Sequence, residues 1–173
     1  MNPAVFLDRD GVLVRERGYL TRPDQLEILE GAPRALAALR DAGLRLVVVT
    51  NQSAVGRGLL DEAGLGRIHE TLARRLEEAG ASWDALYYCS HHPTAGQGEY
   101  RLACECRKPK PGMLLRAALE MNLDCGRSWM VGDSARDMHA GRAAGCRTLA
   151  LPGPDGSFPE AADLQAPTLE AAG

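Results

Sequence analysis

Two carboxylates follow directly on a short apolar run near the start of the chain, in the stretch Val5-Phe6-Leu7-Asp8-Arg9-Asp10-Gly11. The apolar residues predict a buried strand. Carboxylates two residues apart repel each other unless a cation lies between them or one of them keeps its proton. A hydrophobic core does not require Asp8 and Asp10, so the pattern indicates a chemical site where the strand ends. The alternative is a strand followed by a simple Asp-Gly turn.

Polar groups also follow two later apolar runs. Thr50 and Asn51 follow the second of the predicted strands, and Asp133 follows the fourth, with Asp137 one helical turn later. Taken singly, each group is explained by a strand exit, a helix cap or a surface acid, and the isolated Lys108 by a solvated loop. Parallel strands, however, would bring all of these groups to one edge of a sheet.

These groups, brought together, predict a particular chemistry. Clustered carboxylate oxygens are ligands that suit Mg²⁺. A hydroxyl, backbone N–H groups at a turn and a lysine suit a phosphoryl group. The combination predicts phosphoryl transfer, in which catalysis consists mostly of positioning and charge neutralisation.

The elements that must position these groups alternate between strand and helix along the whole chain. Alternation of this kind predicts an α/β fold with a doubly wound, mostly parallel sheet and helices on both faces. With 173 residues and no linker, we expect a single domain over residues 1–173. Four prolines and alternating alanines and acids predict a weakly ordered end over residues 152–173. Strands are expected at 5–7, 44–49, 85–89, 129–131 and 148–151, and helices at 32–42, 61–80 and 111–123 and before Gly145.

Composition excludes several classes of protein. Apolar residues make up 45% of the chain and charged residues 25%, as in soluble globular proteins. The net charge of −3 provides no basic surface for nucleic acid, and no apolar run approaches the roughly 20 residues of a membrane span. Five cysteines without a secretory signal favour a reducing compartment, so we expect a cytoplasmic protein. We also expect a monomer.

Four residues of a long loop form the pattern C-x-H-x12-C-x-C: Cys89, His91, Cys104 and Cys106. Three thiolates and one imidazole make a closed tetrahedral zinc set without an open position for catalysis. The sequence therefore predicts a structural zinc that orders the loop 89–106, and Lys108 stands two residues after its last ligand. The alternative is three reduced cysteines and a surface histidine.

In this order, the blocks resemble the haloacid dehalogenase-type phosphatases. The match comprises the stretch from Asp8 to Val12, the hydroxyl of Thr50, Lys108, and Asp133 with Asp137 after the fourth strand. The resemblance implies a Rossmann-like fold, and the absence of a long insertion implies that there is no large cap domain.

The resemblance also implies roles for the carboxylates. Asp8 would be the nucleophile that forms an aspartyl-phosphate, and Asp10 would protonate the leaving oxygen and then activate water. Mg²⁺ would be held by the Asp8 carboxylate, the Asp10 backbone carbonyl and Asp133, with Asp137 as an orienting residue. A receiver-type signalling module is the alternative. Asp10 argues against it, because an acid two residues after the nucleophile turns over the phosphorylated intermediate.

The remaining groups would hold the substrate. The resemblance implies that Thr50 and the backbone N–H of Asn51 would bind phosphate oxygens. It also implies that Lys108 would neutralise the charge of Asp8 and of the phosphate. The zinc loop narrows the resemblance to the histidinol-phosphate and heptose-bisphosphate phosphatase group. The substrate-binding candidates that this group implies are Gly18, Tyr19, Asn51, Ser53 and Arg107.

Within that group the motifs are most similar to the heptose-bisphosphate branch. That branch implies removal of the 7-phosphate from a phosphorylated sugar, D-glycero-D-manno-heptose 1,7-bisphosphate, in the synthesis of lipopolysaccharide core precursors; histidinol phosphate is the alternative substrate. Enzymes of this branch often carry a lysine where this chain has Ser134. Arg57, Arg107 and Arg136 are candidates to replace that charge.

Overall fold

Six strands form one sheet in the computed structural model, which describes residues 1–172. The strand order is β3-β2-β1-β4-β5-β6 and every pairing is parallel. The predicted α/β, Rossmann-like sheet is confirmed, and it is parallel throughout rather than mostly so. The strands are β1 (Ala4–Leu7), β2 (Arg45–Asn51), β3 (Ala85–Cys89), β4 (Trp129–Gly132), β5 (Arg147–Ala150) and β6 (Leu164–Gln165).

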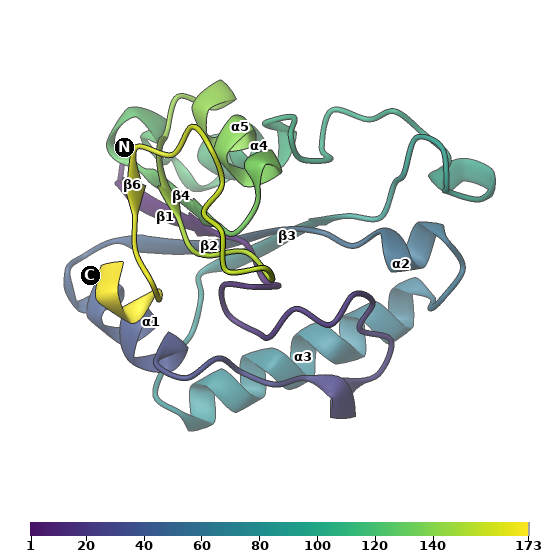
Figure 1. Ribbon diagram of the computed structural model, residues 1–173, viewed down its shortest axis with the longest axis horizontal. Coiled ribbons are helices and arrows are strands. Elements are labelled where there is room, and N and C mark those ends of the chain that lie inside the picture. The colour runs from purple at the N-terminus through teal and green to yellow at the C-terminus, as the bar shows by residue number, and fades with distance from the viewer. Residues whose placement is uncertain (173) are drawn as a thin grey trace.

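Helices cover both faces of this sheet (Figure 1). In Figure 1, α1 and α3 lie below the sheet, and α4 and α5 lie above it. The α-helices are α1 (Ala32–Asp41), α2 (Ser53–Gly56), α3 (Glu62–Glu78), α4 (Gly112–Met121) and α5 (Ala135–Ala143). Short 3₁₀ turns are η1 (Pro23–Gln25), η2 (Gly98–Tyr100), η3 (Cys125–Arg127) and η4 (Glu170–Ala172).

Alternate residues of the central strands divide the core into two layers. Val5 and Leu7 of β1 pack with the apolar face of α3, whereas Phe6 packs with α4 and α5 on the other side. This is why the strands are continuous apolar runs: both of their faces are buried. The helix α3 begins as predicted, since the Asp61 side chain accepts a hydrogen bond of 2.6 Å from the Gly64 N–H.

The segment after β5 contains elements that the sequence pattern concealed. Its alternation of alanines with acids hides β6, which pairs with only two residues of β5. Ala166 and Leu169 are buried in the same core layer as α1. The contacts of this segment are thus defined, and its weak order stays a prediction.

The sheet order places the ends of three strands side by side. β1 lies between β2 and β4, because the chain runs from β1 outward to β2 and β3 and then crosses back to β4 on the other side of β1. Parallel sheets bind ligands at such a switch point, outside the carboxyl ends of the strands.

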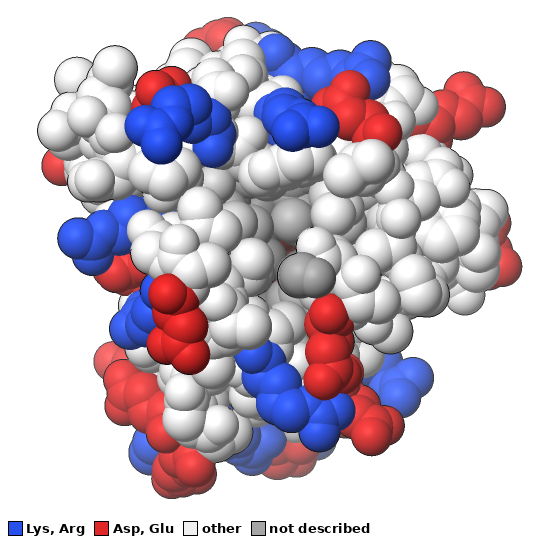
Figure 2. Space-filling view, turned by 90° about the vertical axis from the view of Figure 1, so that its left-hand side faces the viewer, with Lys and Arg blue, Asp and Glu red and all other residues white. Residues whose placement is uncertain are grey.

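Within residues 1–172 there is no separate cap domain, and no helix is both long and apolar enough to cross a membrane. The face in Figure 2 carries acidic and basic side chains interspersed.

Candidate active site

A pocket of about 490 Å³ opens at the carboxyl ends of the strands. Asp8, Asp10, Lys108 and Asp133 line it, so the structure brings the predicted catalytic and magnesium residues together. Thr50 is the exception among them, because it is completely buried beneath the pocket. All of the predicted substrate-binding residues also line the pocket: Gly18, Tyr19, Asn51, Ser53 and Arg107.

Three carboxylates at the pocket floor form a candidate metal centre. Asp8, Asp133 and Asp137 each place an oxygen within 4.8 Å of the others. Burial, with a smaller contribution from neighbouring carboxylates, raises the pKa of Asp8 to about 7 although Lys108 opposes the shift. Burial and the charge of Asp137 raise the pKa of Asp133 to about 6. A divalent cation would relieve this repulsion, so the donor set fits Mg²⁺.

The side chain of Asp10 is not part of this carboxylate cluster. It is turned toward Arg9, whose Nη2 lies 2.9 Å from Asp10 Oδ2. This placement agrees with the expectation that Asp10 would contribute its backbone carbonyl, rather than its carboxylate, to the metal. The carboxylate of Asp10 is thereby kept outside the candidate metal centre.

Lys108 is a buried ion-pair partner and not a solvated loop charge. Only 1% of the residue is exposed. Its Nζ lies 2.6 Å from Asp137 Oδ1 and 3.1 Å from Asp8 Oδ2, and it donates a hydrogen bond of 2.8 Å to the Val49 carbonyl. Burial alone would lower the pKa of Lys108, but Asp137 and Asp8 outweigh it and the pKa is raised. The ammonium group therefore stays charged beside the proposed nucleophile.

Asn51 fixes the backbone that carries this lysine. Its side-chain amide donates to the Lys108 carbonyl and its amide oxygen accepts from the Lys108 N–H, both at 3.0 Å. The sequence assigned only its backbone N–H to the substrate. The paired hydrogen bonds add a structural role, because they tie the end of β2 to the loop that follows the cysteines.

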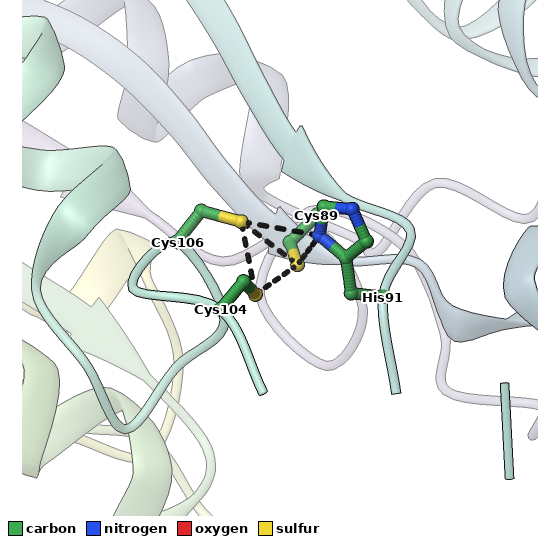
Figure 3. Close-up of side chains that lie close together, drawn as sticks. All are labelled: Cys89, His91, Cys104 and Cys106. Atoms are coloured by element: carbon green, nitrogen blue, oxygen red, sulfur yellow. Dashed lines mark hydrogen bonds between the residues drawn. The ribbon is translucent and has the colours of Figure 1, made fainter. Parts of the chain in front are cut away.

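The predicted zinc residues converge on one point, as Figure 3 shows. The Sγ atoms of Cys89, Cys104 and Cys106 lie 3.1 to 3.5 Å apart, and His91 Nδ1 lies 3.5 Å from Cys106 Sγ and 3.6 Å from Cys89 Sγ. A tetrahedral zinc with Zn–S bonds of about 2.3 Å separates its sulfurs by about 3.8 Å. The donor set therefore fits zinc with a small expansion, and all its cysteines are free thiols.

Sequence reasoning missed three buried polar residues beside the site: Arg9, Gln52 and His69. Gln52 donates to Thr50 Oγ1 at 2.8 Å and to Asp10 Oδ2 at 2.9 Å. For His69 a signal did exist, because it stands four residues after Leu65 and so falls on the apolar face of α3. Arg9 gave none, since an arginine in a turn is ordinarily exposed.

Gly11 provides a first test of the metal centre. Its φ is +78°, and a Cβ added there would lie 1.9 Å from Asp133 Oδ2. We expect Gly11→Ala to displace Asp133 and to raise the Mg²⁺ concentration needed for half-maximal phosphate release roughly 10- to 100-fold. Gly80→Ala is the matched control, because Gly80 has the same φ of +78° with nothing within 4 Å. An unchanged magnesium requirement in Gly11→Ala would exclude Asp133 as a ligand.

A protein-family model described as haloacid dehalogenase-like hydrolase matches residues 6–145. This chain belongs to the haloacid dehalogenase-like hydrolases. The match spans the carboxylates, Lys108 and the cysteine loop, so the resemblance drawn from the motifs is confirmed for the family.

Two relatives within the haloacid dehalogenase-like hydrolases carry the same name. The D-glycero-beta-D-manno-heptose-1,7-bisphosphate 7-phosphatase of Pasteurella multocida strain Pm70 is 45% identical over 151 residues, 87% of this chain and 82% of the relative. The protein of that name from Escherichia coli K12 is 42% identical over 149 residues, 86% of this chain and 78% of the relative. The predicted enzyme class, a phosphatase of this family rather than a receiver module, is confirmed.

Solved structures agree with this grouping. The D,D-heptose 1,7-bisphosphate phosphatase from B. bronchiseptica, complexed with magnesium and phosphate, matches with a TM-score of 0.85 and 34% identity, over 98% of this chain and 95% of that one. The phosphatase of the same name from Burkholderia thailandensis matches with a TM-score of 0.70 and 31% identity, over 98% and 95%. The haloacid dehalogenase-like fold therefore extends over nearly the whole chain.

Proposed function

We propose that this chain is a Mg²⁺-dependent phosphatase that removes the 7-phosphate of D-glycero-D-manno-heptose 1,7-bisphosphate. The observation that carries the chemistry is the cluster of Asp8, Asp133 and Asp137 around the buried Lys108. The names of the relatives support the substrate. The product would enter the synthesis of activated heptose for lipopolysaccharide core.

The first half of the reaction transfers the phosphoryl group to Asp8. A carboxylate oxygen of Asp8 attacks phosphorus while the bond to the sugar oxygen breaks, and Asp10 gives its proton to that oxygen. The Asp8 Oδ1 atom accepts a hydrogen bond of 2.7 Å from the Arg9 N–H, which fixes the carboxylate plane. Lys108 and the Thr50 hydroxyl balance the charge of the phosphoryl oxygens.

The second half releases inorganic phosphate. Asp10, now ionised, takes a proton from a water molecule, the water oxygen attacks phosphorus, and the bond between phosphorus and Asp8 breaks. Asp8 and Asp10 lie in different surroundings, as these two steps require, since Asp8 must react as a nucleophile and Asp10 must exchange a proton.

Two metals complete the proposal. Asp8, Asp133 and the Asp10 backbone carbonyl would hold Mg²⁺, which when bound neutralises phosphoryl oxygens. Asp137 is an orienting residue, because it pairs with Lys108 and accepts hydrogen bonds from the Ser134 N–H and hydroxyl at 3.1 and 2.7 Å. Cys89, His91, Cys104 and Cys106 would hold structural Zn²⁺.

Three arginines at the pocket supply charge for a second phosphate. Arg57, Arg107 and Arg136 all line the pocket, as does Ser134 in place of a lysine. Burial and then the charge of Arg136 lower the pKa of Arg107, with Arg57 adding to the effect. The Arg57 guanidinium also lies 5.5 Å from the centre of the Tyr19 ring, which draws the loop after β1 toward this side of the pocket. Crowded positive charge of this kind favours a bisphosphate.

The substrate assignment is tested with purified protein and Mg²⁺. We expect kcat/KM for the 7-phosphate of the heptose bisphosphate to exceed kcat/KM for histidinol phosphate by at least about 100-fold, because only the bisphosphate engages the arginines through a second phosphate. Substitution of Arg107 by methionine should reduce this ratio. The reverse ranking of the two substrates would assign the chain to histidinol phosphate instead.

The surroundings of this reaction follow from surface and thiol chemistry. We propose a cytoplasmic monomer whose partner is the small phosphorylated sugar, with no nucleic-acid or membrane partner. Five free cysteines suit a reducing compartment. A net charge of −3 does not attract polyanions.

A further inference from the structure

Arg9, which lies between the two site aspartates, is almost entirely buried, with 1% of its surface exposed. Its guanidinium group remains charged in proteins, and such a group is costly to bury without partners. Every polar contact that it makes is therefore informative. Those contacts run from Asp10, at the pocket, to His69, on α3.

Toward the pocket, Arg9 clamps the carboxylate of Asp10. Nη2 donates to both Asp10 oxygens at 3.0 and 2.9 Å, and Nε donates to Oδ1 at 3.2 Å. The same Nη2 donates to Gln52 Oε1 at 2.9 Å, and Gln52 returns a hydrogen bond to Asp10 Oδ2. Because Gln52 also donates to Thr50 Oγ1, the carboxylate of Asp10 and the buried hydroxyl of Thr50 share one network.

Away from the pocket, His69 holds the other end of the guanidinium. Arg9 Nη1 lies 3.1 Å from His69 Nε2, and because a guanidinium has only donors, the imidazole nitrogen must accept. His69 is buried, with 8% of its surface exposed, and its ring lies 5.6 Å from that of Tyr88. Burial, then the charge of Arg9, lowers the pKa of His69 to about 3, so the ring remains a neutral acceptor.

We propose that His69 is a positioning residue for the reaction, acting through Arg9 to hold the Asp10 carboxylate where it gives and takes the proton. This proposal rests on the phosphatase function proposed above and adds to it a residue from outside the pocket. Without the acceptor on His69, Arg9 Nη1 would lack its buried partner, and the guanidinium would move away from Asp10.

The chemistry of the leaving group separates this role from a merely structural one. An alkoxide leaving group needs the proton of Asp10, whereas p-nitrophenolate leaves without it. The parameter kcat/KM reports the steps up to phosphorylation of Asp8, before water attacks. Misplacing Asp10 should therefore lower kcat/KM for alkyl phosphates and leave that for p-nitrophenyl phosphate nearly unchanged.

The experiment measures kcat/KM of the magnesium-loaded protein for a series of simple phosphate monoesters, from p-nitrophenyl to alkyl phosphates. For His69→Leu we expect a roughly 10- to 100-fold loss on alkyl phosphates and a change within about twofold on p-nitrophenyl phosphate. His69→Gln, which retains an acceptor, should recover most of the loss. Leu72→Ala is the control, because Leu72 is a fully buried residue of α3 in the apolar core.

Three results would overturn the proposal. His69→Leu could lose kcat/KM equally on p-nitrophenyl phosphate and on alkyl phosphates, it could lose none, or Leu72→Ala could show the same selective loss on alkyl phosphates. If His69→Leu does not fold, Arg9→Lys serves instead, since a single ammonium cannot bond Asp10, Gln52 and His69 together. Failure of the proposed substrate is seen separately, as a wild-type protein that hydrolyses the simple esters but not the heptose bisphosphate.

Discussion

We expect Asp8→Asn to reduce the rate of phosphate release by at least about 10³-fold. We also expect the same substitution to stabilise the metal-free protein against unfolding above pH 7. The loss of activity follows from the loss of the nucleophile. The gain in stability follows from burial, because an ionised Asp8 is costly in a pocket that already contains Asp133 and Asp137.

The pH dependence of this gain has a defined sign. The pKa of Asp8 is raised from its ordinary 3.8 to about 7. The protonated Asp8 side chain therefore contributes fully to the free energy of unfolding below pH 3.8, and this contribution is lost as the pH rises through 7. Asparagine does not ionise and retains that contribution. Thermal unfolding with a chelator at pH 5 and pH 8 should therefore separate the two proteins more at pH 8, with Asp8→Asn the more stable.

Asp137→Asn is the control, because it should change the stability at pH 8 in the opposite direction. Asp137 lies 2.6 Å from Lys108 Nζ, and its loss leaves a buried ammonium group with one carboxylate fewer. We expect this variant to be less stable than the wild type at pH 8. An active Asp8→Asn protein, or one destabilised at pH 8 without metal, would contradict the role given to Asp8.

Removal of zinc should have the second large effect. We expect about one tightly held zinc per chain, and we expect its chelation to release residues 89–111 to fast amide hydrogen exchange and to reduce kcat/KM by at least about 100-fold. The reason is that Lys108 reaches Asp8 only because the loop before it is folded. The Arg107 guanidinium donates to the His91 carbonyl at 3.1 Å, which joins the two halves of the loop near that lysine.

The cysteines provide a matched comparison for the zinc prediction. Cys106→Ser removes one donor of the cluster, whereas Cys146→Ser alters a buried free thiol outside it. Zinc content, measured by elemental analysis, should fall in the first variant and stay near one in the second. A zinc-free protein with full activity in Mg²⁺ would refute the link between the loop and Lys108.

The sequence was sufficient to predict those side chains of the candidate site that belong to a recognisable local sequence pattern. Asp8, Thr50 and Asp133 each follow an apolar run, and the alternation of strands and helices predicts that their strands are parallel. The cysteine pattern worked for the same reason, because its residues lie in two short clusters whose spacing reflects metal geometry.

Other features depend on contacts between distant parts of the chain. Arg9 and His69 are 60 residues apart, and only the packing of α3 against the loop after β1 brings them together. The direction of the Asp10 side chain depends on the same packing. The strand β6 has two residues, too few for an alternating pattern to be recognised.

Asp8 and Asp10 divide one reaction between them, Asp8 as the nucleophile and Asp10 as the acid and base, and one measurement tests this division directly. The Asp10→Asn protein is incubated with Mg²⁺ and p-nitrophenyl phosphate, quenched with acid, digested and analysed by mass spectrometry. We predict that phosphate accumulates on the peptide that contains Asp8, because p-nitrophenolate leaves without a proton donor whereas water attack needs Asp10. Rapid turnover by this variant, or phosphate on any other residue, would contradict the account.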